Sequence, residues 1–225
     1  LGLNVRAQSV HSRTTLKSLL LEGKMCRYAF TRHGEAAHNV IIAKARQLGE
    51  DQLLLRGRSM LDPELTEDGR TQASKLAQSL NKDEFSLIIT SPLTRALQTT
   101  QILLAESLNA KVVVTSLSTE NGIPVEGDDV AGKPCQRGPS LEFIKMHYPH
   151  FDVSSLEDRA NWTGSIKEGF FHPLSVSERV PHFRSWLRNL PSDQRILVVG
   201  HSGFYTKFLG GAKMANCEIV FRDDI

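Results

Sequence analysis

The chain has 225 residues, of which 40% are hydrophobic and 23% are charged, and its formal net charge is +2. This composition is typical of a soluble globular protein, long enough for one α/β domain or two small ones. The small net charge argues against nucleic-acid and membrane partners, so a bound anion would have to meet local positive charge. Three widely spaced cysteines without a CxxC pair argue against a disulfide framework or a zinc site and favour a reducing, cytoplasmic location.

The first 24 residues form a separate basic segment. They contain four arginines and lysines, and their first acidic residue is Glu22. We expect a basic, partly helical extension before a single domain at residues 25–225. Transit peptides share this composition, so organellar targeting by residues 1–24 is the alternative.

Four short apolar runs are the predicted strands, and their Val and Ile content suits a parallel sheet buried on both faces. Helical patterns lie between them, one capped by Thr66, one starting at Ser91 and Pro92, and one with Pro181 in its first turn. This alternation predicts a three-layer α/β/α sandwich with a mostly parallel central sheet. Residues 41–60 are expected to form a helix followed by a loop, and residues 122–140 a long loop. The predicted strands are residues 27–31, 86–90, 111–115 and 195–199.

Polar residues follow three of these strands. Open parallel sheets bind ligands beyond the carboxyl ends of their strands, so we expect these residues to converge on one edge. Arg95 falls in the first turn of a predicted helix, where a cation opposes the helix dipole unless an anion binds there. The alternative for Arg95 is an exposed side chain pointing at solvent. The strand-end residues are Arg32 and His33, then Ser91 and Arg95, then Gly200, His201 and Ser202.

Spacing disfavours two other kinds of site. The segment HGEAAH resembles the zinc motif HExxH, but His33 and His38 are five residues apart and would lie about 140° apart on a helix. The segment GHSGF resembles a serine nucleophile elbow, but position 204 is phenylalanine and no histidine follows His201. A metal site and a serine hydrolase are therefore both disfavoured.

Four ordered blocks together resemble the histidine phosphatase superfamily, also called the phosphoglycerate mutase-like superfamily. They cover about residues 27 to 219, and the resemblance implies the phosphoglycerate mutase-like fold. The blocks are TRHGEAAHN (31–39), which resembles the RHG signature, DPELTEDGRTQA (62–73), SPLTRALQT (91–99) and VVGHSG (198–203).

The resemblance also implies roles for individual residues. His33 matches the nucleophile that becomes phosphohistidine, and Glu120 resembles the proton donor. The segment LSTENG has one residue fewer after the glutamate than the family pattern, so Glu126, Asp128 and Asp129 remain alternatives to Glu120. The matches to the phosphate pocket are Arg32, Arg95 and His201, with Asn39 as a further phosphoryl contact.

The chemistry of these residue types agrees with phosphoryl transfer. Two arginines offer forked donors that match phosphate geometry and stabilise charge on its equatorial oxygens. A neutral imidazole can attack phosphorus and split one difficult step into two. A carboxylic acid can then protonate the leaving oxygen. This chemistry needs no metal and no cofactor, and the expected partner is a small-molecule phosphate ester. Oligomeric state cannot be predicted.

Details of the blocks favour one branch. Mutases of this superfamily typically have tryptophan where this chain has His38, which favours a phosphatase over a phosphoglycerate mutase. The segment KPCQRGPS resembles a block of the phosphoglycerate mutase-like proteins of plants and fungi, in which Arg137 is either a substrate contact or an exposed loop residue. Ser202 after His201 argues against the acid phosphatase branch. A low-activity binding or regulatory module with the same fold is the remaining alternative.

Overall fold

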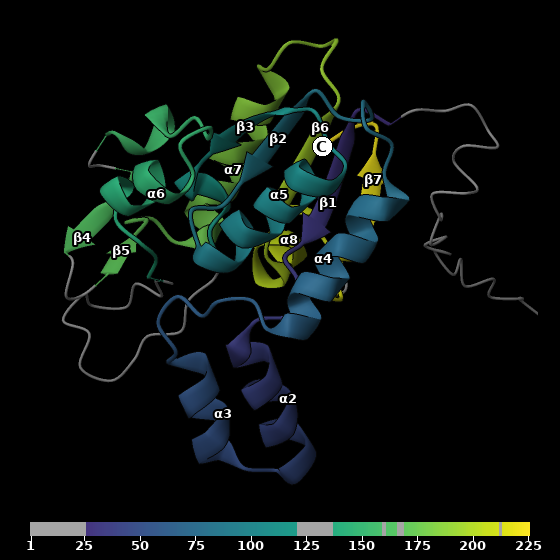
Figure 1. Ribbon diagram of the computed structural model, residues 1–225. Helices are drawn as coiled ribbons and strands as arrows, with labels where there is room; N and C mark the ends of the chain where they lie inside the picture. Colours follow the sequence, from purple (N-terminus) through teal and green to yellow (C-terminus); the bar gives the residue numbers. More distant parts are fainter. Residues whose placement is uncertain (1–25, 121–136, 159–160, 166–168, 212) are drawn as a thin grey trace, which may run out of the picture.

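Figure 1 shows the computed structural model, which describes residues 26–120, 137–158, 161–165, 169–211 and 213–225. Its centre is a five-stranded sheet in the order β3-β2-β6-β1-β7, with helices on both faces. Four strands are parallel, and β7 runs antiparallel to β1 at one edge. The predicted α/β/α sandwich is confirmed, whereas the basic segment 1–24 lies outside the described residues. The strands are β1 (Tyr28–Arg32), β2 (Leu87–Thr90), β3 (Lys111–Val114), β6 (Ile196–Gly200) and β7 (Ile219–Arg222).

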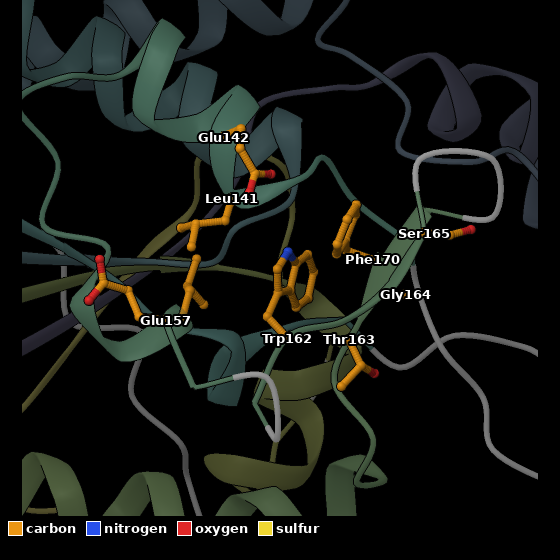
Figure 2. Close-up of a pocket in the computed structure, with 9 residues that line it drawn as sticks. Leu141, Glu142, Glu157, Trp162, Thr163, Gly164, Ser165 and Phe170 are labelled. Carbon is orange, nitrogen blue, oxygen red and sulfur yellow. The ribbon is translucent and has the colours of Figure 1, made fainter.

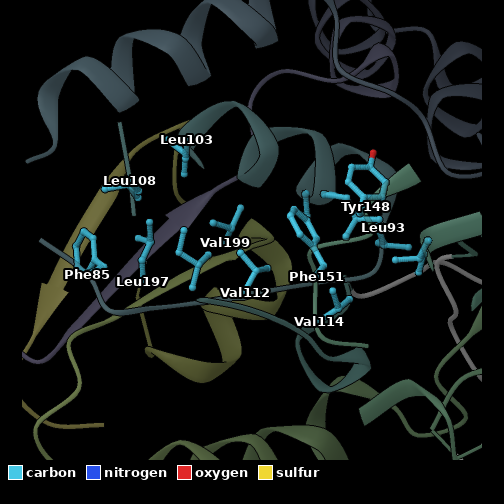
Figure 3. Packing of buried hydrophobic residues seen from close by; sticks show 14 of the residues in the cluster. Phe85, Leu93, Leu103, Leu108, Val112, Val114, Tyr148, Phe151, Leu197 and Val199 are labelled. Atoms are coloured by element: carbon cyan, nitrogen blue, oxygen red, sulfur yellow. The ribbon is translucent and has the colours of Figure 1, made fainter. Parts of the chain in front are cut away.

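The strands bury side chains on both faces, as their continuous apolarity predicts. Along β6, Leu197 and Val199 join the core beneath helices α4 (Glu67–Ser79) and α5 (Thr94–Glu106), part of which is drawn in Figure 3. Ile196 and Val198 face the other core, against helices α7 (Val176–Arg188) and α8 (Ser202–Phe208). The sheet is thereby held between two helical layers, and its carboxyl edge is left to the polar residues.

Helix α5 begins later than its sequence suggests. Ser91 and Pro92 were expected as N-cap and first residue, but the helix runs from Thr94 with Leu93 at the cap. The prediction was wrong because the capping carboxylate comes from another segment. Thr94 donates its backbone N–H to Asp62 Oδ1 at 2.8 Å and its hydroxyl to Oδ2. Ser91 is left free for a different partner.

Helix α7 begins earlier than expected, at Val176. Ser175 caps it in a capping box with Glu178, each side chain accepting a hydrogen bond from the other's backbone N–H. Pro181 is therefore the sixth helical residue, in the second turn, and the expectation of a first-turn proline was wrong. By contrast, the Thr66 cap of α4 is confirmed, since its hydroxyl accepts the Gly69 N–H at 3.0 Å.

Residues 41–60 form most of a helical hairpin rather than a helix and a loop. Helices α2 (Ala37–Leu48) and α3 (Asp51–Arg58) pack against each other and stand apart from the sheet in Figure 1. The base of the excursion is closed by a bridge between Ala36 and Leu65 and by Thr66 N–H donating to the Glu35 carbonyl at 2.9 Å. The sharp turn between the helices uses Gly49, whose φ of 69° suits glycine.

Beyond β3, a smaller subdomain lies beside the sheet. It contains helix α6 (Leu141–His147) and the hairpin of β4 (Thr163–Ser165) and β5 (Gly169–Phe171). Most of the predicted long loop, residues 122–136, lies outside the described residues. In the part of the chain that is described, no helix is long and apolar enough to cross a membrane.

Candidate active site

The carboxyl ends of three adjacent strands bring the predicted residues together. The sheet order places β6 between β2 and β1, with Arg32 of β1 paired in register with Gly200 of β6. The His33 backbone N–H then donates to the Gly200 carbonyl at 3.0 Å. The rings of His33 and His201 lie 5.1 Å apart, centre to centre. The expected convergence of the first and last clusters on one edge is thus met by the structure.

The imidazole of His33 is held in one tautomer. Its Nδ1 lies 2.6 Å from the Gly34 carbonyl, which can only accept, so Nδ1 carries the proton. Its Nε2 accepts a hydrogen bond from Arg95 Nε at 3.2 Å and therefore carries the lone pair. Burial, followed by the charge of Arg95, lowers the pKa of His33 well below its usual value. The ring is neutral at physiological pH, with Nε2 as a nucleophilic atom.

Arg95 is a buried cation, not an exposed side chain. It is 0% exposed in the first turn of α5, whose start is fixed by the Asp62 carboxylate. Burial lowers the pKa of Arg95, and the carboxylates of Asp62 and Glu120 oppose that shift. Burying a guanidinium is costly unless it is paired or hydrogen-bonded, which argues for a role beyond packing. Its guanidinium faces His33, where a phosphate would lie.

His201 and its neighbours contribute further polar nitrogens. Its Nε2 lies 2.8 Å from the Ser91 hydroxyl, and burial lowers the pKa of His201 well below its usual value. His201 Nδ1, Arg32 Nε and His38 Nδ1 are all buried without a hydrogen-bond partner among the described residues. Native structures rarely leave such groups unsatisfied without a functional reason. The phosphoryl oxygens of a substrate would satisfy them.

The Glu120 side chain contacts the first turn of α8, the helix that directly follows His201 in the chain. Its Oε1 accepts the Phe204 N–H at 3.1 Å and its Oε2 accepts the Gly203 N–H at 3.3 Å. A Cβ atom at position 203 would meet this carboxylate, so a side chain there would displace Glu120. Glu120 thus shares the pocket edge with His201. The alternatives Glu126, Asp128 and Asp129 lie outside the described residues.

Asn39 is the third residue of α2 and is engaged in local bonds. Its Oδ1 accepts the Ala36 N–H at 3.0 Å and a bond from Asn216 Nδ2 at 3.4 Å. Its Nδ2 therefore donates to His38 Nε2 at 3.0 Å, which leaves the proton of His38 on Nδ1. Asn216 also donates to the His33 carbonyl at 2.9 Å. The role of Asn39 as a phosphoryl contact remains a prediction.

Comparisons with known proteins bear on this geometry. The family model of the histidine phosphatase superfamily (branch 1) matches residues 28–120, which hold His33, Arg95 and Glu120. The matched segment is similar to this superfamily and covers less than half of the chain. Three of the four sequence blocks lie within this segment, and the fourth, residues 198–203, lies outside it.

Individual relatives are more distant. Phosphoserine phosphatase 1 of Hydrogenobacter thermophilus is 28% identical over 153 residues, which are 65% of this chain and 63% of that protein. The chain therefore spans less than two thirds of that relative's length. A mycobacterial glucosyl-3-phosphoglycerate phosphatase structure is 23% identical with a TM-score of 0.49, covering 85% of this chain and 88% of its own. A phosphoserine phosphatase structure from Entamoeba histolytica is 19% identical with a TM-score of 0.44, and the match covers 85% of this chain and 87% of that one.

Two of the four sequence blocks meet each other in one backbone contact. Gly34, of the RHG block, meets Gly69, in the first turn of α4, backbone to backbone. A Cβ atom at Gly34 would collide with the Gly69 carbonyl, and one at Gly69 would collide with the Glu35 carbonyl. Glycine is needed at both positions because of this close approach. The contact holds the loop that carries the nucleophile against α4.

Sequence reasoning missed several residues that support this site. Asp62 and Asn216 act from segments that were not expected to reach it. Arg179 lies on α7, where its position three residues after Val176 puts a charge on the buried stripe of Val176, Phe183 and Leu187. A charged residue on an apolar stripe was a signal that the sequence did offer.

A second hollow lies away from His33, between α6 and the β4–β5 hairpin (Figure 2). It has a volume of about 720 Å³ and is lined by Trp162, Phe170 and the carboxylates of Glu142 and Glu157, among others. Its described lining residues include no arginine or lysine, so it does not suit a phosphate. No group of three or more potential metal ligands occurs among the described residues.

Proposed function

We propose that this protein is a metal-independent phosphatase that hydrolyses small phosphate monoesters through a phosphohistidine at His33. The observation that carries the proposal is the neutral His33 ring, whose Nε2 faces Arg95 while buried nitrogens of Arg32, His38 and His201 lack partners among the described residues. The match of residues 28–120 to the histidine phosphatase superfamily supports it. We assign the activity to one domain, residues 25–225.

The first step forms a bond between His33 Nε2 and phosphorus as the bond to the ester oxygen breaks. Arg32 and Arg95 neutralise charge on the phosphoryl oxygens, and His201 donates through Nδ1. Nδ1 of His33 keeps its proton, because the Gly34 carbonyl stabilises the positive charge that the ring gains. The lowered pKa of His33 keeps the ring unprotonated before attack.

Glu120 is the proposed proton donor. The carboxylic acid then gives its proton to the departing alkoxide, a contribution of about 10²–10⁴-fold in general acid catalysis. In the second step the carboxylate takes a proton from water as that water attacks phosphorus. Histidine is released and inorganic phosphate is formed.

Trapping the intermediate tests this proposal. Acid quenching is unsuitable because phosphohistidine is acid-labile, so labelled ester is quenched in base and His33 is identified by peptide mapping. We expect base-stable label on His33 and none in His33→Ala, which should also lose turnover. Full activity in His33→Ala would refute the proposal. Isomerisation of 3-phosphoglycerate without phosphate release would indicate a mutase, and no activity on any ester would indicate a binding module.

The same site suggests which esters to test. Phosphoserine is the first choice, because the relative from Hydrogenobacter is named a phosphoserine phosphatase, and phosphoglycerates are the second. Sugar phosphates and an aryl phosphate complete the panel. All of these esters share the phosphoryl contacts. A difference in kcat/KM among them would therefore report contacts to the rest of the substrate.

A further inference from the structure

Arg179 is the most deeply buried charged residue outside the phosphate pocket. It is 2% exposed on α7, and its guanidinium donates to backbone carbonyls of the segment that leads to Glu120. Nη1 donates to the carbonyls of Leu117 at 2.7 Å and Thr119 at 2.9 Å. Weaker contacts reach the carbonyls of Ser116 and of Glu120 itself, both at 3.5 Å, and Nε donates to Leu174 at 3.1 Å.

These bonds hold a segment that has little regular structure of its own. After β3 the chain makes one 3₁₀ turn, Ser116–Ser118, and then reaches Glu120. A buried guanidinium that bonds only neutral carbonyls is unfavourable, because these hydrogen bonds offset only part of the free energy of desolvating the charge. The charge of Glu120 counteracts the effect of burial on the pKa of Arg179, which is lowered to about 10.

Glu120 is therefore held at both ends. Its backbone is fixed by Arg179 through the carbonyls of residues 116, 117, 119 and 120. Its carboxylate is fixed by the N–H groups of Gly203 and Phe204. Arg179 also lies over the Phe204 ring, at 5.7 Å from its centre. One side chain thus joins the loop of Glu120 to the helix that follows His201.

We propose that Arg179 is a positioning residue that sets the distance between Glu120 and the leaving oxygen of the substrate. The inference rests on the proposed function, in which Glu120 is the proton donor. Arg179 itself touches neither substrate nor phosphate. A displacement of about 1 Å in a catalytic group can cost as much as 100-fold in rate, so loss of the clamp should be visible in proton transfer.

Leaving-group chemistry separates this role from general stabilisation. An aryl phosphate such as p-nitrophenyl phosphate expels a stable phenolate and depends little on a proton donor, whereas an alkyl phosphate such as phosphoserine depends on it strongly. A misplaced Glu120 should therefore slow the alkyl ester and spare the aryl ester. Damage to the fold or to the phosphate pocket should slow both esters alike.

The test compares Arg179→Lys with a control on the same helix. Lysine keeps the charge but lacks the fork, so it cannot bond the same set of carbonyls. Arg184 is the control, because it also donates to a backbone carbonyl, that of Phe208 at 2.7 Å, and lies over an aromatic ring, yet contacts no part of the Glu120 segment. Arg184→Lys therefore measures the effect on activity of replacing an arginine of α7 that does not hold Glu120.

We expect Arg179→Lys to lower kcat for phosphoserine by about tenfold or more and for p-nitrophenyl phosphate by less than about threefold, with KM little changed. Arg184→Lys should show no such split. Glu120→Gln should show it more strongly. The double variant Arg179→Lys with Glu120→Gln should be no slower than Glu120→Gln alone, because both changes act on one proton transfer.

The outcomes distinguish the inference from the proposed function. Equal losses on both esters, or multiplied losses in the double variant, would overturn the role of Arg179 and leave the phosphatase intact. Absence of the split in Glu120→Gln would overturn the assignment of Glu120 and, with it, this inference. Circular dichroism and thermal unfolding of Arg179→Lys verify the fold, and a melted variant is replaced by Arg179→Gln, which keeps donors without the charge.

Discussion

Mild acid should strongly destabilise this protein, because three buried histidines and the partly buried His38 are held in neutral form. His33, His172 and His201 are at most 6% exposed. Burial lowers the pKa of His38 to about 3 and that of His172 to about 4, and it lowers the pKa of His33 and His201 well below 6.5. In the unfolded chain all four take up protons near pH 6.5. Stability conferred by these neutral rings is therefore lost as the pH falls below that value.

The magnitude follows from proton linkage. Between about pH 7.5 and pH 5.5 each such histidine binds a proton in the unfolded chain only, which lowers the free energy of unfolding by about 1.4 kcal/mol. The four histidines together lower the free energy of unfolding by about 5.6 kcal/mol. Asp62 acts in the opposite direction, since burial raises its pKa to about 6, and it offsets about 0.8 kcal/mol of this loss. A net loss of about 5 kcal/mol is a large fraction of the 5–15 kcal/mol typical of a domain.

Urea unfolding followed by circular dichroism measures this loss at the two pH values, in buffers without phosphate. His172→Asn is the control, because asparagine can keep the bond that His172 Nδ1 accepts from Leu174 N–H at 3.0 Å. The variant should show a pH-dependent loss smaller by about 1.4 kcal/mol than the wild type. A change of less than about 1 kcal/mol in the wild type would refute the neutral burial of these rings.

Three further predictions concern the pocket and its support. Arg95→Met should lower kcat/KM by about 10²–10³-fold on aryl and alkyl esters alike, since it removes a donor to the phosphoryl group, and a loss under threefold would contradict this. Vanadate at about 100 times its Kd should add about 2.7 kcal/mol of stability and raise the Tm by about 5–10 °C in a thermal-shift assay, and Arg32→Gln should remove most of that shift. Gly69→Ala should destabilise the fold by about 1–3 kcal/mol and reduce kcat, because the added methyl group meets the Glu35 carbonyl. Gly49→Ala, with φ of 69° and open space around it, should cost about 1 kcal/mol in urea unfolding and leave kcat unchanged.

The sequence predicted the four parallel strands because each is a short apolar run, and three of them, β1, β2 and β6, are buried on both faces. The polar residues that follow these strands could be predicted to lie close together, because the carboxyl ends of parallel strands meet at one edge of the sheet. The edge strand β7 gave a weaker signal, because its four residues are only partly buried. Periodicity locates a strand best where both of its faces are covered.

Other parts depend on contacts between distant segments, which local patterns do not contain. The start of α5 is set by a carboxylate 32 residues away in sequence, so Ser91 and Pro92 were a misleading signal. The bonds of Arg179 go to backbone carbonyls about 60 residues away, and carbonyls carry no residue identity to recognise. The resemblance to a family identified His33, whereas only the coordinates give the tautomer of its ring.

The closed base of the α2–α3 hairpin makes that excursion a replaceable module. The chain leaves at Ala36 and returns at Leu65, which pair with each other, and the glycine contact below them anchors the nucleophile loop independently. Doubling the length of such an insertion costs only about 0.6 kcal/mol in closure entropy. An excursion of different length or shape could therefore be exchanged within residues 41–60 without moving His33, provided that Asn39 and Asp62 stay in place, so new substrate ranges could be engineered by grafting there.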